Sequence, residues 1–200
     1  MLFVVQLNGQ KLNYGVKLGL SESSFAIDYA RTALPSTGFT GGPFASYSIG
    51  NYIAVEAGVN YLQKGATNWL KNDSTHSNVL IHAIDVPILA TFMPLGNESK
   101  DVFPRVFIGH AISWNMASSS DNRRDSKLVK GLVNKTATDM SSIVNYFDYG
   151  VVFGFGLTFN TPDRIFTIDA GYRLGYSDVV LQKYENLSIN SYFITVGVGL

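Results

Sequence analysis

The feature that most constrains this chain is an alternation of side-chain type with a period of two residues. Its clearest copy spans 147–159, where the odd positions read Phe, Tyr, Val, Phe, Phe, Leu, Phe and the even positions read Asp, Gly, Val, Gly, Gly, Thr. A β-strand points successive side chains to opposite faces, whereas a helix would scatter these residues around its circumference. The segment is therefore predicted to be a strand with one apolar face.

The same alternation recurs in seven further segments, which gives eight expected strands. These segments are 14–20, 39–49, 53–64, 84–92, 105–115, 166–176 and 191–200. Such strands can cross a bilayer at a tilt, for which about 9–11 residues suffice. In contrast, no run approaches the ~18 apolar residues that a membrane-spanning helix requires.

The composition of the second face decides which class of β protein to expect. That face is dominated by Gly, Ser, Asn and Thr, and only 15% of the chain is charged, against about 25% in ordinary soluble domains. Small side chains suit the narrow interior of an eight-stranded barrel, so the apolar face would point outward to lipid. We predict an all-β fold, an eight-stranded antiparallel up-and-down transmembrane barrel. The alternative is a soluble periplasmic barrel that holds an apolar ligand, whose outer face should be richer in Lys and Glu.

Charges on the inner face are balanced in sign. The chain has 15 Lys+Arg and 15 Asp+Glu, and four of each sign fall on the small-residue face by parity. A narrow lumen requires its charges to be paired, so we predict a lumen charge network of Lys17, Glu56, Lys64, Asp85, Arg105, Asp148, Asp169 and Arg173. On the outward face of the expected strands there is no Asp, Glu, Lys or Arg, and the only histidine is His110.

Loop lengths and aromatic positions predict how the barrel lies in the membrane. Long connections (21–36, 66–78, 117–145 and 177–189) alternate with short ones (50–51, 93–103 and 160–164), which is typical of extracellular loops and periplasmic turns. Both termini would then be periplasmic. Aromatic residues at the strand ends predict two girdles: Tyr61, Trp114, Tyr149, Tyr176 and Tyr192 at the outer rim, and Tyr14, Phe92, Phe159 and Phe166 at the inner rim.

Composition excludes several functions. There is no basic excess to bind nucleic acid, and the absence of cysteine excludes disulfides, thiolate metal sites and a cysteine nucleophile. The Gly-x-Gly spacings lie inside strands, so they form no phosphate loop, and we expect neither a metal nor a cofactor. Residues 1–10 are read either as the remnant of a signal peptide or as a frayed terminus. Residues 11–200 are read as one barrel domain.

Two features leave function open. An acyl hydrolase acting on lipid A or phospholipid would need a Ser–His pair oriented by an acid, but Ser113 lies on the face opposite His110. We therefore expect a non-catalytic protein, with the hydrolase as the alternative. Segment 117–145 is polar and mixed in charge. It is either a contact surface for protein, glycan or lipopolysaccharide, or a solvated loop without a partner.

Several motifs also carry a family resemblance. They are YGVKLGL (14–20), GFTGG…NYLQKG (38–65), IDVPIL (84–89), RVFIG (105–109), FDYGVVFGFGLTF (147–159) and DAGYRLGY (169–176). In this order they resemble the PorT-like outer-membrane β-barrel family of Bacteroidetes. The resemblance implies a monomeric barrel among outer-membrane lipid and lipopolysaccharide, and some such relatives assist type IX secretion. We therefore expect a structural or accessory envelope protein with a plugged lumen, acting in protein secretion or at the cell surface.

Overall fold

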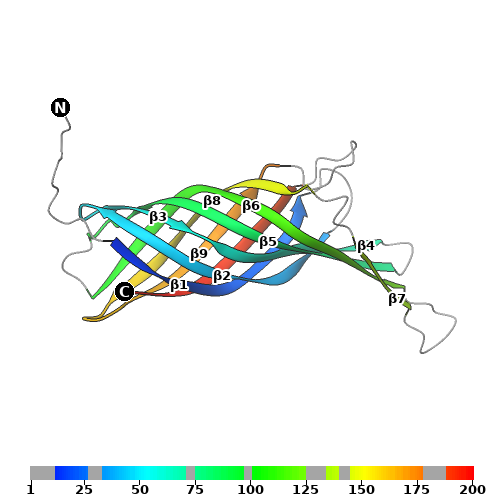
Figure 1. Cartoon of the computed structure of the whole chain (residues 1–200), viewed down its shortest axis with the longest axis horizontal. Coiled ribbons are helices and arrows are strands. Elements are labelled where there is room, and N and C mark those ends of the chain that lie inside the picture. The colour runs from blue at the N-terminus through cyan, green and yellow to red at the C-terminus, as the bar shows by residue number, and fades with distance from the viewer. Residues whose placement is uncertain are drawn as a thin grey trace.

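Antiparallel strands make up all the regular structure of the described residues in the computed structural model (Figure 1). The structure describes residues 12–26, 33–70, 75–96, 101–124, 134–139, 145–177 and 188–200. The strands are β1 (Leu12–Ala26), β2 (Ala33–Ile49), β3 (Ile53–Gly58), β4 (Asn60–Leu70), β5 (Thr75–Phe92), β6 (Val102–Arg124), β7 (Asn134–Asp139), β8 (Phe147–Asn160), β9 (Ile165–Gly175) and β10 (Ser188–Gly199). Within these ranges, no helix is long and apolar enough to cross a membrane.

Eight wall strands close into a barrel, which confirms the predicted fold. β3 and β4 together form one wall strand, since both lie between β2 and β5, and β7 is added outside the wall against β6. Each wall strand pairs antiparallel with its neighbour in the chain. The barrel closes where β1 pairs with β10, from Gly15 opposite Gly199 to Ala26 opposite Ser188.

The two-residue alternation sorts side chains between the outside and the lumen. In β8, Phe155 is 67% exposed on the outside, whereas Asp148 is 0% exposed in the lumen. The outward face of the barrel carries large hydrophobic side chains on its strands, among them Leu18, Ile108 and Ile194. An exposed apolar belt of this kind requires an apolar solvent around it.

The two ends of the barrel differ. The turn end carries the connections β2–β3, β5–β6 and β8–β9 and the C-terminus (Figure 1). Leu12 lies there too, paired with Tyr47 near the end of β2. Gly50 and Gly96 have positive φ angles of 74° and 72° there, a conformation that residues other than glycine rarely adopt. The β8–β9 turn is closed by a hydrogen bond from the Thr161 amide to the Arg164 carbonyl, 2.8 Å long. We call the opposite end the loop end.

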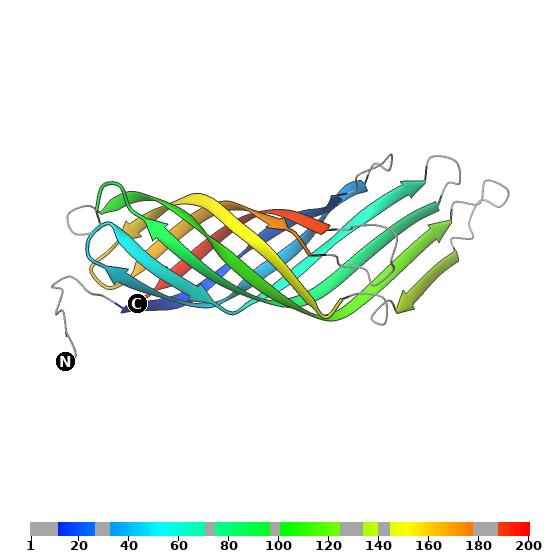
Figure 2. The same cartoon turned by 90° about the horizontal axis from the view of Figure 1, so that it is seen from above.

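The predicted loops at 21–36, 66–78 and 117–145 are wrong in part, because paired strands continue into each of them. β4, β5, β6 and β7 continue as a four-stranded arm (Figure 2), in which Thr67 pairs with Asn78, Asn78 with Asp121, and Asp121 with Ala137. β2 borders this arm as far as Asn68, which pairs with Ala33. We define the arm as 66–70, 75–79, 118–124 and 134–139. Both faces of a sheet in water can be polar, so these strands lack the alternation that identified the wall.

A β-bulge marks the place where the wall passes into the arm. His82 pairs with Ala117 while Ala83 pairs with Asn115, so Met116 is the extra residue. As a result Met116 and Ala117 are both exposed, although Asn115 and Ser118 on either side are buried. The bulge resets the alternation by one residue, as bulges at barrel rims commonly do.

Close backbone approach makes a glycine substitution in the wall a test of the register. A Cβ added at Gly109 would lie 2.0 Å from the Ile88 carbonyl oxygen, whereas at Gly58 the nearest atom is 3.3 Å away. Gly109→Ala should therefore lower the free energy of unfolding by about 1–3 kcal/mol, the range for overpacking. Urea unfolding of the barrel in detergent micelles measures this, with Gly58→Ala as the matched control. Equal stability of the two variants would contradict the pairing of β5 with β6.

Candidate functional site in the barrel lumen

The eight charged residues predicted for the lumen all lie inside the barrel, where they form two groups. Each group holds two cations and two anions. The turn-side quartet consists of Lys17, Glu56, Arg105 and Asp169. The loop-side quartet consists of Lys64, Asp85, Asp148 and Arg173. Each quartet is therefore formally neutral.

Arg105 is the centre of the turn-side quartet. Its Nε donates to Asp169 Oδ1 at 2.8 Å, and its Nη1 donates to Glu56 Oε2 at 3.0 Å. Lys17 completes the quartet through an ion pair with Glu56 and a second with Asp169, the latter at 3.1 Å. Each carboxylate therefore receives two cations, and the guanidinium fork matches carboxylate geometry.

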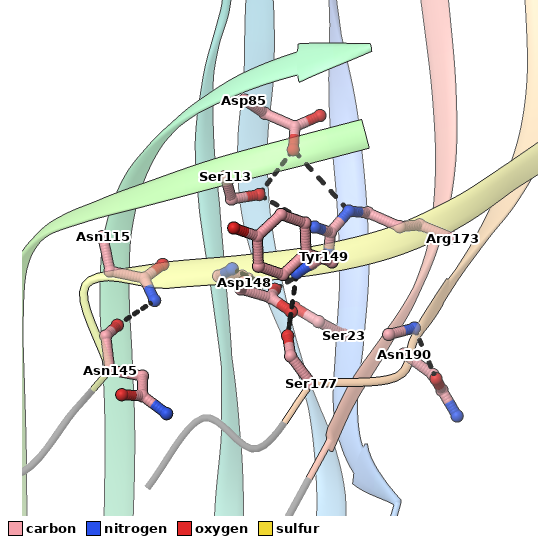
Figure 3. A network of polar contacts seen from close by, with 12 residues as sticks. Ser23, Asp85, Ser113, Asn115, Asn145, Asp148, Tyr149, Arg173, Ser177 and Asn190 are labelled. Carbon is pink, nitrogen blue, oxygen red and sulfur yellow. Dashed lines mark hydrogen bonds and ion pairs between the residues drawn. The ribbon is translucent and has the colours of Figure 1, made fainter. Parts of the chain in front are cut away.

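The loop-side quartet is organised around Asp148 and Arg173 (Figure 3). Asp148 Oδ2 accepts from Lys64 Nζ at 2.6 Å and from Arg173 Nη1 at 2.9 Å. Arg173 Nε lies 3.6 Å from Asp85 Oδ1. Ser113 links the two sides, since its hydroxyl donates to Asp85 at 2.5 Å and accepts from Arg173 Nη2 at 2.9 Å.

An apolar layer lies between the two quartets. It consists of Leu89, Phe107, Ala111 and Val152, with Phe193 packed against it. Along β6 the order from the turn end is Arg105, Phe107, Ala111 and Ser113, so charged, apolar and charged layers follow one another. The sequence pattern does not predict this layer as a unit, although apolar residues at inward, small-residue positions are the signal that indicates it.

Inward glycines provide the room for the inward rings. A Cβ built at Gly154 would lie 2.5 Å from Phe107 Cζ, and one built at Gly171 would lie 2.4 Å from Phe193 Cζ. The two phenyl rings are stacked with centroids 6.3 Å apart. Gly154 and Gly171 are thus packing partners of aromatic rings from other strands.

The described lumen residues enclose two cavities. A vestibule of about 330 Å³ opens at the turn end and is lined by residues including Phe44, Phe103, Arg105 and Thr167. A second cavity of about 70 Å³ lies deeper, between the quartets and beside the apolar layer. Arg105 borders both cavities, so the turn-side quartet forms the floor of the vestibule.

The aromatic residues predicted for the girdles lie on the outward face. At the loop end the exposed rings are Tyr61, Trp114, Tyr149, Tyr176 and Tyr192; at the turn end Tyr14, Phe92 and Phe166 are exposed and Phe159 is half-buried. The Tyr61 hydroxyl lies 2.5 Å from His82 Nδ1. The sequence pattern does not predict this contact, because the two residues lie on different strands. The rings of Tyr172 and Tyr192 are 4.6 Å apart.

His110 is exposed on the outward face and sits between apolar neighbours. It pairs in register with Ile88 of β5 and Val151 of β8. In the part of the chain that the structure describes, no serine or carboxylate is hydrogen-bonded to it, and Ser113 belongs to the loop-side quartet instead. The same described residues contain no group of three His, Cys, Asp or Glu that could hold a metal ion.

Comparison with known proteins gives a family and a fold. The family model of the outer membrane protein beta-barrel domain matches residues 6–180. Among solved structures, the outer membrane protein OprG from Pseudomonas aeruginosa is similar at 10% identity, with 96% of each chain covered and a TM-score of 0.57. Neisserial surface protein A is similar at 16% identity, with 96% of this chain and 99% of that chain covered and a TM-score of 0.50. No curated protein matches by sequence.

Removing Arg105 tests the turn-side quartet. Arg105→Met would leave Glu56 and Asp169 with only Lys17, and breaking a buried ion pair lowers the free energy of unfolding by about 3–5 kcal/mol. Urea titration of the folded barrel in micelles measures the loss. The double variant Arg105→Met/Asp169→Asn should recover part of it, because one uncompensated charge is gone. A single variant as stable as the parent chain would show that the quartet does not hold the wall strands together.

Proposed function

Because the chain belongs to the outer membrane protein beta-barrel domain family, a family of the bacterial outer membrane, we propose that it is a monomeric structural or accessory component of the envelope with a plugged lumen. The finer part of this proposal is a role in protein secretion or at the cell surface, which the PorT-like motifs support. We further propose that the protein is not catalytic. Its neighbours in the membrane would be lipid and lipopolysaccharide.

One observation carries this proposal: the lumen is filled by layers of side chains that satisfy one another. Two neutral quartets flank an apolar layer, and the cavity between them measures only about 70 Å³. Charges that line an open aqueous pore would be free to meet solutes, whereas these are bound to each other. A barrel filled in this way supports a role at its ends or its outer surface rather than in conduction.

Single-channel recording tests the plugged lumen. Purified protein inserted in a planar bilayer should give no steady unitary conductance, because ions would have to break paired charges to pass. Heat-modifiable migration on gels should confirm that the inserted protein is folded, and a large porin in the same bilayer provides the positive control. Reproducible conductance steps at the same protein concentration would refute the proposal.

We also propose that the turn end faces the periplasm and the loop end faces the medium. Short turns on the periplasmic side and long connections outside are the rule for bacterial barrels. The arm, which extends from the loop end, would then project from the cell surface. Both Leu12 and Leu200 would lie on the periplasmic side.

Cysteine labelling tests the orientation cleanly, because the chain contains no cysteine. Asn122→Cys in the arm should react in intact cells with a maleimide that cannot cross the membrane. Asp163→Cys in the β8–β9 turn should react only after the outer membrane is permeabilised. The opposite labelling pattern would reverse the assignment of the two ends.

The arm supports a second element of the proposal, a contact surface at 117–145. Among the described residues, β7 is the last strand of the sheet and pairs with β6 alone. An unpaired strand edge can accept a further strand from another molecule. A photo-cross-linker attached at Asn122→Cys should therefore join a specific protein in native membranes, and the same reagent at Asp163→Cys should not. Absence of any adduct at Asn122→Cys would leave the arm without this role.

A further inference from the structure

A groove on the lipid-facing side of the wall lies at the turn end, over the seam where β1 meets β10. Its volume is about 410 Å³, and the side chains that line it are mainly apolar, namely Tyr14, Val16, Pro43, Phe44, Val198 and Leu200, with Arg164 at the rim. Gly15 and Gly199 face each other across the seam and also line the groove. A Cβ built at Gly199 would lie 3.6 Å from Cζ of the buried Phe44, so this pair leaves space on the lumen side of the seam.

The groove adjoins the vestibule inside the barrel. Four residues line both spaces, which are Phe44, Arg164, Gly199 and Leu200. The vestibule adds hydroxyl groups from Ser46, Ser48, Thr158 and Thr167. Thr167 is only 3% exposed, and its Oγ1 has no hydrogen-bond partner in the described part of the chain. The groove is mainly apolar, whereas the vestibule mixes these hydroxyl groups with apolar side chains such as Met93 and Phe103.

Arg164 lies at the junction of the groove and the vestibule, where its guanidinium can contact an anionic ligand. Its backbone is held in the turn by Thr161, whose hydroxyl donates to the Arg164 carbonyl at 2.7 Å and accepts from the Arg164 amide at 3.1 Å. The residue is exposed, and among the residues that the structure describes no carboxylate forms an ion pair with its guanidinium. Arg105 and Lys17, by contrast, are neutralised within the turn-side quartet.

We propose that the groove and the vestibule together bind one phospholipid at the rim of the barrel. An acyl chain would lie in the apolar groove, the phosphate would contact Arg164, and the polar headgroup would turn over the rim toward Thr167. The apolar groove suits an acyl chain, and Arg164 with the vestibule hydroxyls suits the headgroup. Each space falls within the usual size of ligand pockets, about 300–1,000 Å³. Placing this lipid in the periplasmic leaflet rests on the proposed orientation, but binding itself does not.

Native mass spectrometry tests the site on the full chain in detergent, titrated with phosphatidylethanolamine. The parent protein should retain one lipid under conditions that strip the others. Arg164→Gln should bind about tenfold more weakly, the loss expected for one charge-assisted hydrogen bond. Asp163→Asn is the matched control in the same turn, and it should bind as well as the parent or better because it removes a nearby negative charge.

A second set of variants tests the groove independently of the charge on Arg164. Val198→Trp should fill the groove and reduce lipid retention. The control Val106→Trp, which faces lipid on β6 away from the seam, should retain lipid like the parent. If Val198→Trp fails the heat-modifiability test, Val16→Trp replaces it. Inorganic phosphate should not displace the lipid at equal concentration. The proposal is overturned if Arg164→Gln and Val198→Trp both retain lipid like the parent, or if inorganic phosphate competes equally. Cysteine labelling tests the orientation separately, so a wrong orientation can be distinguished from the absence of a lipid site.

Discussion

Closure of the sheet between β1 and β10 is the constraint on which the rest of this structure depends. A membrane interior offers no water to backbone amides and carbonyls, so an open sheet edge cannot persist there. The seam from Gly15–Gly199 to Ala26–Ser188 removes both edges at once. Closing with eight wall strands also sets the diameter, because a barrel of this size has an interior only wide enough for side chains.

That narrow interior determines what the inward side chains must do. Charged groups that leave water need partners, and the lumen provides them within two neutral quartets rather than along one extended chain of charges. Between the quartets, rings fill the space that glycines leave free, as Phe107 does over Gly154 and Phe193 over Gly171. The apolar layer thus occupies the part of the lumen that lies between the two charged quartets.

Because the middle of the barrel is filled, the two ends are the places where this protein can meet other molecules. They are built differently. At the loop end, β4 to β7 extend the wall into an arm, in which β7 is the outermost strand among the described residues. At the turn end the chain reverses tightly, and a vestibule and an outer groove share Phe44, Arg164, Gly199 and Leu200. The family match places the barrel in the outer membrane. The proposed protein contact lies at the loop end, and the proposed lipid site lies at the turn end.

The sequence by itself determined the barrel and the side of the wall on which each residue lies. Alternation with a period of two is a local property of the strand backbone, so the inward position of Asp148 and the outward position of Phe155 follow from their neighbours in the chain. Which cation meets which anion did not follow, because the pairs join residues far apart: Lys17 with Glu56 at a separation of 39 residues, Arg105 with Asp169 at 64, and Lys64 with Asp148 at 84. The register and tilt of the closed sheet determine which of these charged residues form ion pairs. The arm and the Tyr61–His82 contact were decided in the same way, since each requires neighbouring strands to be in place before its residues meet.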